Sequence, residues 1–151
     1  MNKFLYIFML FHLSFAFNET IYKDTYLIYK NKYQSHINIK EISRLKSQGF
    51  FYYTVKNGEI CDYSENILIN KTTYKSMLPI LIHELTHYLQ CIYSNKNNKN
   101  ITSIKNHVLP LHTIQFIENV YDKKHWNMEY EAFYYQDNIN EFHKLENLLY
   151  F

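Results

Sequence analysis

The stretch "LPILIHELTHYLQC", Leu78 to Cys91, places two histidines and a glutamate among Ile, Leu and Tyr. On a helix, His83 and His87 stand one turn apart on the same face, so both imidazoles can reach one ion, with Glu84 beside them. Two imidazoles and one further protein ligand suit Zn²⁺ and leave a coordination position open for water. We therefore interpret the stretch as a metal-binding helix, against the alternative of a coincidental, purely structural pair.

The residues around this motif predict a helix that is buried on most of its sides. Apolar residues flank the two histidines at Ile80, Leu81, Ile82, Leu85 and Leu89. Thr72 and Thr73 can cap the start of the helix, and Pro79 falls in its first turns, where a missing N–H costs least. We expect the helix to run from about residue 75 to residue 93.

A third metal ligand has to come from elsewhere, and the downstream segment "HWNMEYEAFYYQ" offers Glu129 and Glu131. Two residues apart on a helix, they point to opposite sides, so only one can face the ion. We favour Glu129, because Ala132 falls on the same face and its small side chain allows close packing against the first helix. Glu131 is the alternative, and His107 and His112 are less favoured candidates. Without the upstream motif, both glutamates would be interpreted as a solvated acidic face.

Two segments taken together resemble a known family. "HELTHYLQ" followed by "EYEAFYYQ" resembles the gluzincin arrangement, H-E-x-x-H and a later E-x-x-A helix, of thermolysin-like and membrane-associated zinc peptidases and of small exported bacterial proteins. The resemblance covers Tyr74 to Gln136 and leaves the N-terminal half uncovered. It implies that His83 and His87 are metal ligands, Glu84 the catalytic base and Glu129 the third ligand.

The resemblance also implies a function, a zinc metallopeptidase acting on a peptide or protein substrate by Glu84-assisted attack of zinc-bound water. A donor for the tetrahedral oxyanion is usual in such a site, and His107, His112 and Tyr121 are candidates. The sequence departs from the pattern at Phe133, where many of these families carry an Asp or Asn that hydrogen-bonds a zinc histidine. The alternatives are a non-catalytic zinc-binding adaptor or inhibitor domain, and a metal-independent interaction protein that binds through its tyrosines.

The remaining segments predict an α+β fold, in which a small antiparallel sheet packs on the zincin active-site helix and further helices follow. "FFYYTVKNGEICDY", residues 50–63, has β-type runs on both sides of Asn57-Gly58 and predicts a hairpin. "NILIN", residues 66–70, predicts a third short strand. The sheet is therefore expected just before the metal-binding helix.

Helical patterns precede the predicted hairpin and follow the metal-binding helix. "INIKEISRLKSQGF", residues 37–50, predicts a short amphipathic helix stopped by Gly49. Its apolar side would carry Ile39, Ile42 and Leu45. Residues 113–121 and 126–151 predict two further helices, the second broken near residues 138–140.

The N-terminus is typical of a signal peptide at residues 1–16: "MNK" is a positive start, "FLYIFMLFHLSFAF" an apolar stretch, and "SFA" a small-residue cleavage site. Cleavage after Ala16 leaves residues 17–151 as a single zincin-like domain, secreted or periplasmic, with no stable membrane span. As a helix the apolar stretch reaches about 21 Å, short of a hydrocarbon core of about 30 Å. An uncleaved anchor and a buried N-terminal helix are the alternatives, but the polar residues 18–26 continue no helical stripe.

Cysteine usage and charge narrow the class of protein further. In an oxidising compartment two cysteines of a small domain are more often paired than free, so we predict a disulfide between Cys61 and Cys91, with two buried thiols as the alternative. A length of 151 residues suits one domain with one core. The net charge is +2 and Arg44 is the only arginine, which leaves no basic surface for nucleic acid.

Overall fold

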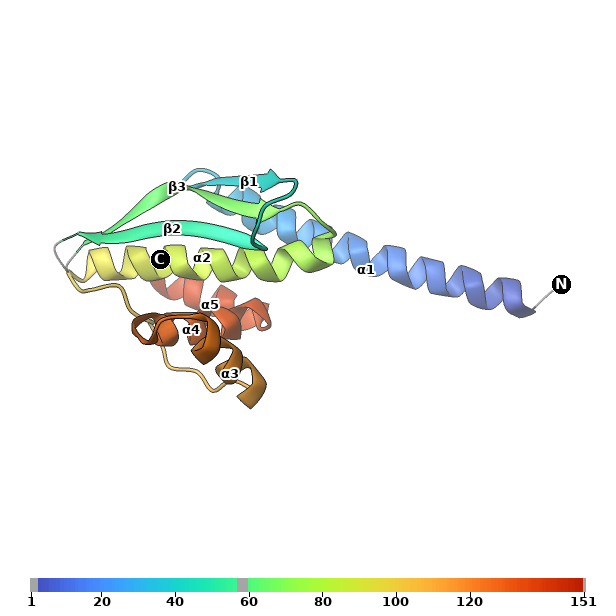
Figure 1. Cartoon of the computed structure of the whole chain (residues 1–151). Helices are drawn as coiled ribbons and strands as arrows, with labels where there is room; N and C mark the ends of the chain where they lie inside the picture. The colour runs from blue at the N-terminus through green and yellow to red at the C-terminus, as the bar shows by residue number, and fades with distance from the viewer. Residues whose placement is uncertain (1–2, 57–59, 151) are drawn as a thin grey trace.

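The helix that carries the motif, α2 (Tyr74–Lys96), runs between a sheet on one side and helices on the other (Figure 1). The structure is a computed structural model that describes residues 3–56 and 60–150. The predicted helix is confirmed, with Thr73 at its N-cap position and Pro79 in its first turns. The Thr73 hydroxyl hydrogen-bonds the Ser76 side chain (3.2 Å) and does not cap the helix. Because α2 is covered on both sides, every residue from 81 to 91 except His83 is buried.

The sheet contains β1 (Asn38–Ile42), β2 (Gly49–Lys56) and β3 (Ile60–Asn70) in the order β1-β3-β2. The predicted α+β class is confirmed, and β2 and β3 pair antiparallel on either side of the predicted turn. The turn itself, at Asn57-Gly58, lies outside the described residues. The sheet is mixed, because β1, a strand that was not predicted, pairs parallel to β3 beside the predicted antiparallel pair. The segment 66–70 is the second half of β3, not a separate strand.

The amphipathic helix predicted at residues 37–50 is wrong, because this segment forms β1, a loop and the start of β2. Ile37 and Ile39 are the buried residues, which is the two-residue period of a strand. Arg44 has a φ of 67°, in the left-handed region that a helix interior does not adopt. Long-range pairing with β3 therefore overrides the local helical pattern.

Three C-terminal helices lie on the side of α2 that faces away from the sheet, where the second and third contact α2 and the first packs on the second. They are α3 (Leu111–Val120), α4 (Trp126–Gln136) and α5 (Ile139–Tyr150), and a short 3-10 turn, η1 (Lys123–His125), leads into α4. The break predicted near residues 138–140 is confirmed, since α4 ends at Gln136 and α5 begins at Ile139. Ala132 of α4 is completely buried.

The N-terminal helix, α1 (Lys3–Tyr33), packs its second half against α2 (Figure 1). Residues 18–26 belong to this helix, and Tyr26 is the buried residue among them. Tyr29 and Tyr33 follow it on the same buried face. The signal peptide at residues 1–16 stays a prediction. In the described part of the chain, no helix has both the length and the apolarity to cross a membrane.

The predicted disulfide between Cys61 and Cys91 is confirmed, with a Cα–Cα distance of 5.3 Å. It links the start of β3 to the second half of α2. Next to it, the Asn95 side chain accepts from the Cys61 backbone N–H (2.7 Å) and donates to its carbonyl (2.9 Å). The sheet is thus tied to the helix that carries the candidate site.

Candidate metal centre

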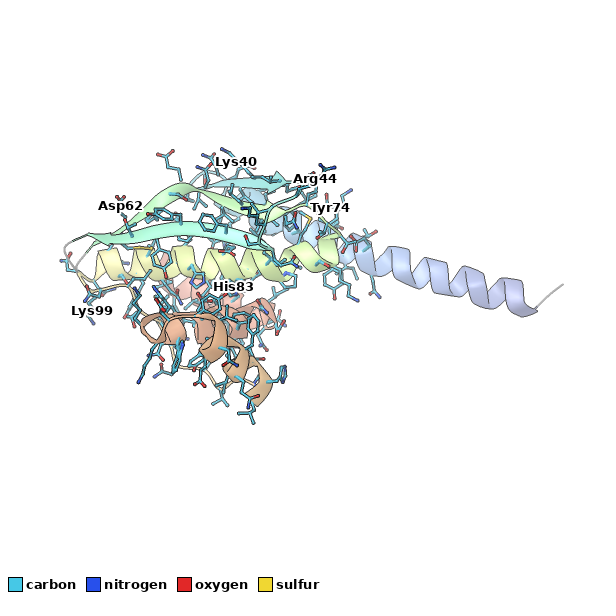
Figure 2. The ribbon with its side chains drawn as sticks, viewed as in Figure 1. Lys40, Arg44, Asp62, Tyr74, His83 and Lys99 are labelled. Carbon is cyan, nitrogen blue, oxygen red and sulfur yellow. A yellow bond between two sulfur atoms is a disulfide. The ribbon has the colours of Figure 1, made fainter. Side chains whose placement is uncertain are left out.

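Three side chains from α2 and α4 converge on one point. His83 lies on the side of α2 away from the sheet (Figure 2), where its Nε2 atom is 3.2 Å from Nε2 of His87. The two carboxylate oxygens of Glu129 lie 3.4 Å from these same nitrogens, one each. His83, His87 and Glu129 therefore form a group that can hold a metal ion.

Gln90 fixes the orientation of the buried His87 ring. Its Nε2 donates both of its protons, to a Glu131 oxygen (2.8 Å) and to the Met128 carbonyl (3.1 Å). Its Oε1, which can only accept, therefore faces Nδ1 of His87 at 2.9 Å, so this nitrogen carries the proton. The lone pair of Nε2 is left to point at Glu129.

Gln136 of α4 contacts the His83 ring, with its Oε1 3.1 Å from Nδ1 of that ring. The site thus brings the two Nε2 atoms together with a carboxylate. Electron-rich atoms this close are stable only when a proton or another cation lies among them. Oε2 of Glu129 is buried and makes no hydrogen bond within the described part of the chain, which leaves it free to bind such a cation.

Glu131, the alternative third ligand, points away from the histidines. Its fully buried carboxylate accepts hydrogen bonds from Gln90 Nε2 and from the backbone N–H groups of Ile104 and Lys105, each at 2.8 Å. The carboxylate anchors the loop before α3 and holds Gln90, which in turn holds His87. Glu131 therefore supports the metal group from outside it.

The charges of the group shift the pKa values of its members. Burial acts to lower the pKa of His87, but the Glu129 carboxylate outweighs it and raises the value to about 9. Burial likewise acts to raise the pKa of Glu129, yet the nearby His87 and His83 hold it well below its usual range. The carboxylate is therefore ionised at neutral pH and available as a ligand.

Glu84 lies beside the metal group, where α2 meets the edge strand β2. It is buried, which raises the pKa of its carboxyl, and it accepts a hydrogen bond from the Phe51 backbone N–H. A Cβ on Gly49 would lie 2.5 Å from Cγ2 of Ile80 and 2.7 Å from Oε1 of Glu84. Only glycine therefore lets β2 come this close to the carboxylate.

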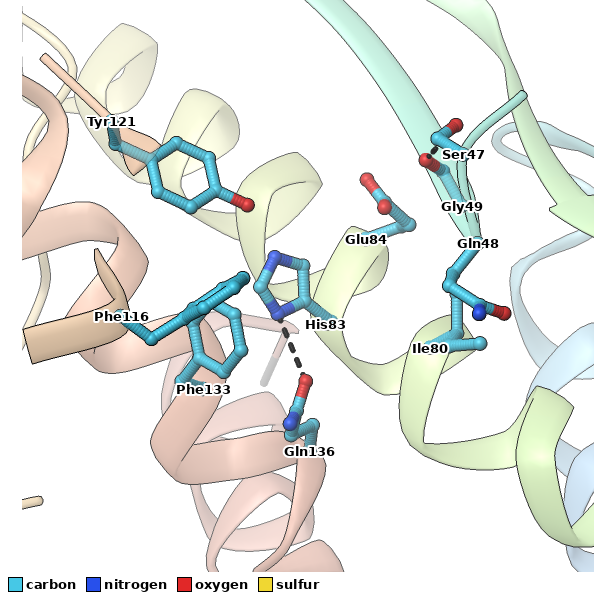
Figure 3. A pocket seen from close by; sticks show the side chains of 10 residues that line it. All are labelled: Ser47, Gln48, Gly49, Ile80, His83, Glu84, Phe116, Tyr121, Phe133 and Gln136. Atoms are coloured by element: carbon cyan, nitrogen blue, oxygen red, sulfur yellow. Dashed lines mark hydrogen bonds between the residues drawn. The ribbon is translucent and has the colours of Figure 1, made fainter. Parts of the chain in front are cut away.

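A cleft of about 370 Å³ opens onto His83 and Glu84 between β2 and the helices α3 and α4 (Figure 3). The residues that line it are Ser47, Gln48, Gly49, Ile80, His83, Glu84, Phe116, Tyr121, Phe133 and Gln136. The metal group is thus reachable from solvent on the side where Glu84 stands.

Of the three candidate oxyanion donors, Tyr121 is the one that lines the cleft. Figure 3 shows its hydroxyl pointing toward His83 and Glu84, and this group has no hydrogen-bond partner among the described residues. Burial, with the charges of Glu129 and Glu84, raises the pKa of Tyr121 to about 12. The Trp126 indole N–H donates to the Tyr121 carbonyl (2.9 Å) and fixes the backbone there.

The two histidine candidates lie elsewhere. The ring of His107 stacks on Tyr134, with centroids 3.9 Å apart, and its Nε2 contacts the Tyr135 hydroxyl at 3.1 Å. His112 is exposed on α3 and does not line the cleft. Neither belongs to the metal group.

Sequence reasoning missed a second tyrosine near the site. The ring of Tyr53, on β2, lies 6.2 Å from that of His87, and its hydroxyl is 3.4 Å from Nδ1 of His125. Burial, helped by the charges of Glu129 and Glu84, raises the pKa of Tyr53. Alternating aromatic residues predicted the strand but carried no signal that this ring would face the metal group.

Comparisons of the chain with protein-family models, with curated proteins and with solved structures found no match.

Proposed function

We propose that this protein is a zinc-dependent metallopeptidase of the gluzincin type. The observation that carries the proposal is the meeting of two oriented imidazoles and one carboxylate with a separate glutamate, Glu84, at the base of an open cleft. A purely structural metal site has no need of a second carboxylate beside an open face.

The donor set and its spacing fit zinc. Two imidazoles and a carboxylate are a common set of three protein ligands at catalytic zinc sites. Ligand atoms about 2.0–2.1 Å from a tetrahedral ion lie about 3.3–3.4 Å from one another. The two imidazole nitrogens lie 3.2 Å apart, close to this spacing, and each lies 3.4 Å from a different oxygen of Glu129. With one ligand atom taken from each residue, the three atoms lie within 4.8 Å of one another. When bound, zinc would supply the Lewis acidity that polarises a carbonyl and lowers the pKa of a water.

Glu84 and Tyr121 would then have separate roles in hydrolysing a peptide bond. Glu84 takes a proton from the attacking water and passes it to the leaving amine, and its raised pKa suits it to both steps. Tyr121 keeps its proton at neutral pH and donates to the oxyanion that forms as the carbonyl carbon becomes tetrahedral. The amine leaves as the C–N bond breaks.

Two further features are compatible with this assignment. Phe133, where the gluzincin pattern has an acid or amide, makes no hydrogen bond to a histidine, but Gln136 accepts one from His83 instead. The disulfide between Cys61 and Cys91 is compatible with an oxidising compartment, so we propose that the protein is exported.

The test compares wild type with Glu84→Gln, Glu129→Gln and the exposed control Glu65→Gln. We would measure zinc content by mass spectrometry and hydrolysis of a mixed fluorogenic peptide library. Wild type and the control should bind about one zinc per chain and cleave. Glu84→Gln should keep the metal and lose about 10²–10⁴-fold in rate, and Glu129→Gln should lose the metal. Zinc without cleavage would favour a non-catalytic zinc-binding domain, and wild type without zinc would overturn the proposal.

A further inference from the structure

An aromatic wall leads from the metal group to the mouth of the cleft. The Phe133 ring meets His83 edge to face, with centroids 4.8 Å apart, and Phe116 meets Phe133 in the same manner at 5.8 Å. Phe116 is half exposed although it is a large apolar side chain. Phe133 has no polar atom that could hydrogen-bond the His83 ring, and Gln136 makes that contact instead.

The rest of the cleft offers no partner for a charged side chain. Ile80 of α2 adds a further apolar surface, and Ser47, Gln48 and Gln136 contribute neutral polar groups (Figure 3). Among the described lining residues, only His83, Glu84 and Tyr121 have ionisable side chains, and all three belong to the site itself. At about 370 Å³ the cleft is near the lower end of ligand pockets, so it suits one or two residues of a chain.

We propose that this wall is a subsite for one large apolar side chain of the substrate, adjacent to the bond that is cut. The inference rests on the proposed function, because the position of the metal group and Glu84 defines where that bond lies. A Phe or Leu side chain on Phe116 and Phe133 removes apolar surface from water on both partners. A Lys or Glu side chain would lose hydration there without gaining a partner, so such peptides are rejected.

The experiment uses blocked fluorogenic heptapeptides that differ at one position, where the residue is Phe, Ala, Lys or Glu. The set is repeated with the varied residue at each position of the peptide in turn. The ratio of kcat/KM values is measured for wild type, Phe116→Ala and Phe116→Lys. The control is Leu111→Ala, which removes another exposed apolar side chain of α3 outside the cleft. Circular dichroism confirms that each variant is folded.

At one position, wild type should prefer Phe over Ala, Lys and Glu. Phe116→Ala should reduce the preference for Phe over Ala about tenfold, the scale that apolar pockets reach for small changes in fit. Phe116→Lys should gain activity toward the Glu peptide, and Leu111→Ala should match wild type. Equal kcat/KM values for Phe and Ala at every position would overturn the subsite while leaving the peptidase assignment in place.

Binding to Glu84→Gln separates the two proposals. If wild type cleaves no peptide, the proposed function fails, and the subsite is judged by isothermal titration of the blocked Phe heptapeptide. The double variant Glu84→Gln/Phe116→Ala is compared with Glu84→Gln alone. A loss of about tenfold in affinity for the Phe peptide supports the subsite. Absence of binding, or binding that Phe116→Ala leaves unchanged, overturns it.

Discussion

The proton on His87 is placed by a chain of hydrogen bonds that starts at the backbone of Ile104 and Lys105. These N–H groups fix Glu131, and Glu131 fixes the amide of Gln90. The amide oxygen then accepts a hydrogen bond from Nδ1–H of His87. Every step joins groups that are at least partly buried, where an unpaired polar group is costly. The chain therefore acts on the metal group without contacting the ion.

Glu131→Gln tests this role and the choice of third ligand together. Loss of the charge weakens three hydrogen bonds at a buried carboxylate, so we expect a loss of about 1–3 kcal/mol in the free energy of unfolding. Urea unfolding measures it. Zinc should still bind, with an affinity reduced by up to about 10–100-fold, as for other groups that orient a ligand.

The matched variant for this prediction is Glu129→Gln, which should lose the metal while unfolding at a urea concentration close to that of the metal-free wild type. If Glu131→Gln instead abolished zinc binding and Glu129→Gln kept it, the assignment of the third ligand would be reversed.

How far the site follows from sequence depends on the reach of each interaction. His83, Glu84 and His87 share one helix, so their common placement follows from a period of 3.6 residues. The choice between Glu129 and Glu131 depends on which face of α4 meets α2, and the small residue Ala132, on the face of Glu129, was the local pattern that favoured Glu129. Gln90 could have been identified, because it stands three residues after His87 on the same helix.

At the scale of elements, the local sequence pattern of β1 wrongly predicted a helix, and β2 forms one side of the cleft. A run of a few apolar residues fits a helix or a strand, and only the pairing of Ile39 with Ile67 across β1 and β3 decides for the strand. The loop after β1 then leads to Gly49, which lies against Glu84 of α2. A helix at residues 37–50 would have left this side of the cleft open.

Gly49→Ala should displace the catalytic base. The added methyl would lie 2.5 Å from Cγ2 of Ile80 and 2.7 Å from Oε1 of Glu84, and the carboxylate, at the end of a flexible side chain, gives way first. We expect a fall of about 1–3 kcal/mol in stability, and a larger fractional loss in kcat than in zinc content. Tyr52→Thr on the outer side of β2 is the control and should keep its kcat. Unchanged kcat in Gly49→Ala would mean that β2 can shift at no cost to the site.

At the scale of the whole molecule, α2 is joined to its neighbours in two different ways. The disulfide joins it covalently to β3, and the metal group joins it to α4. The first link does not need an ion, and the second includes buried groups that repel one another without a cation. The attachment of the sheet to α2 and the attachment of α4 to α2 can therefore be broken separately.

Cys61→Ala/Cys91→Ala breaks the first link. The bond closes a loop with a sequence separation of 30, for which the chain-entropy model gives about 3.6 kcal/mol, and measured losses are typically about 2–4 kcal/mol. Urea unfolding should show this loss both with and without zinc, while zinc stoichiometry stays that of wild type, because His83, His87 and Glu129 remain where α2 meets α4. If the variant lost its zinc, the orientation of α2 would depend on the sheet as well as on α4, and the metal group would be a property of the whole fold.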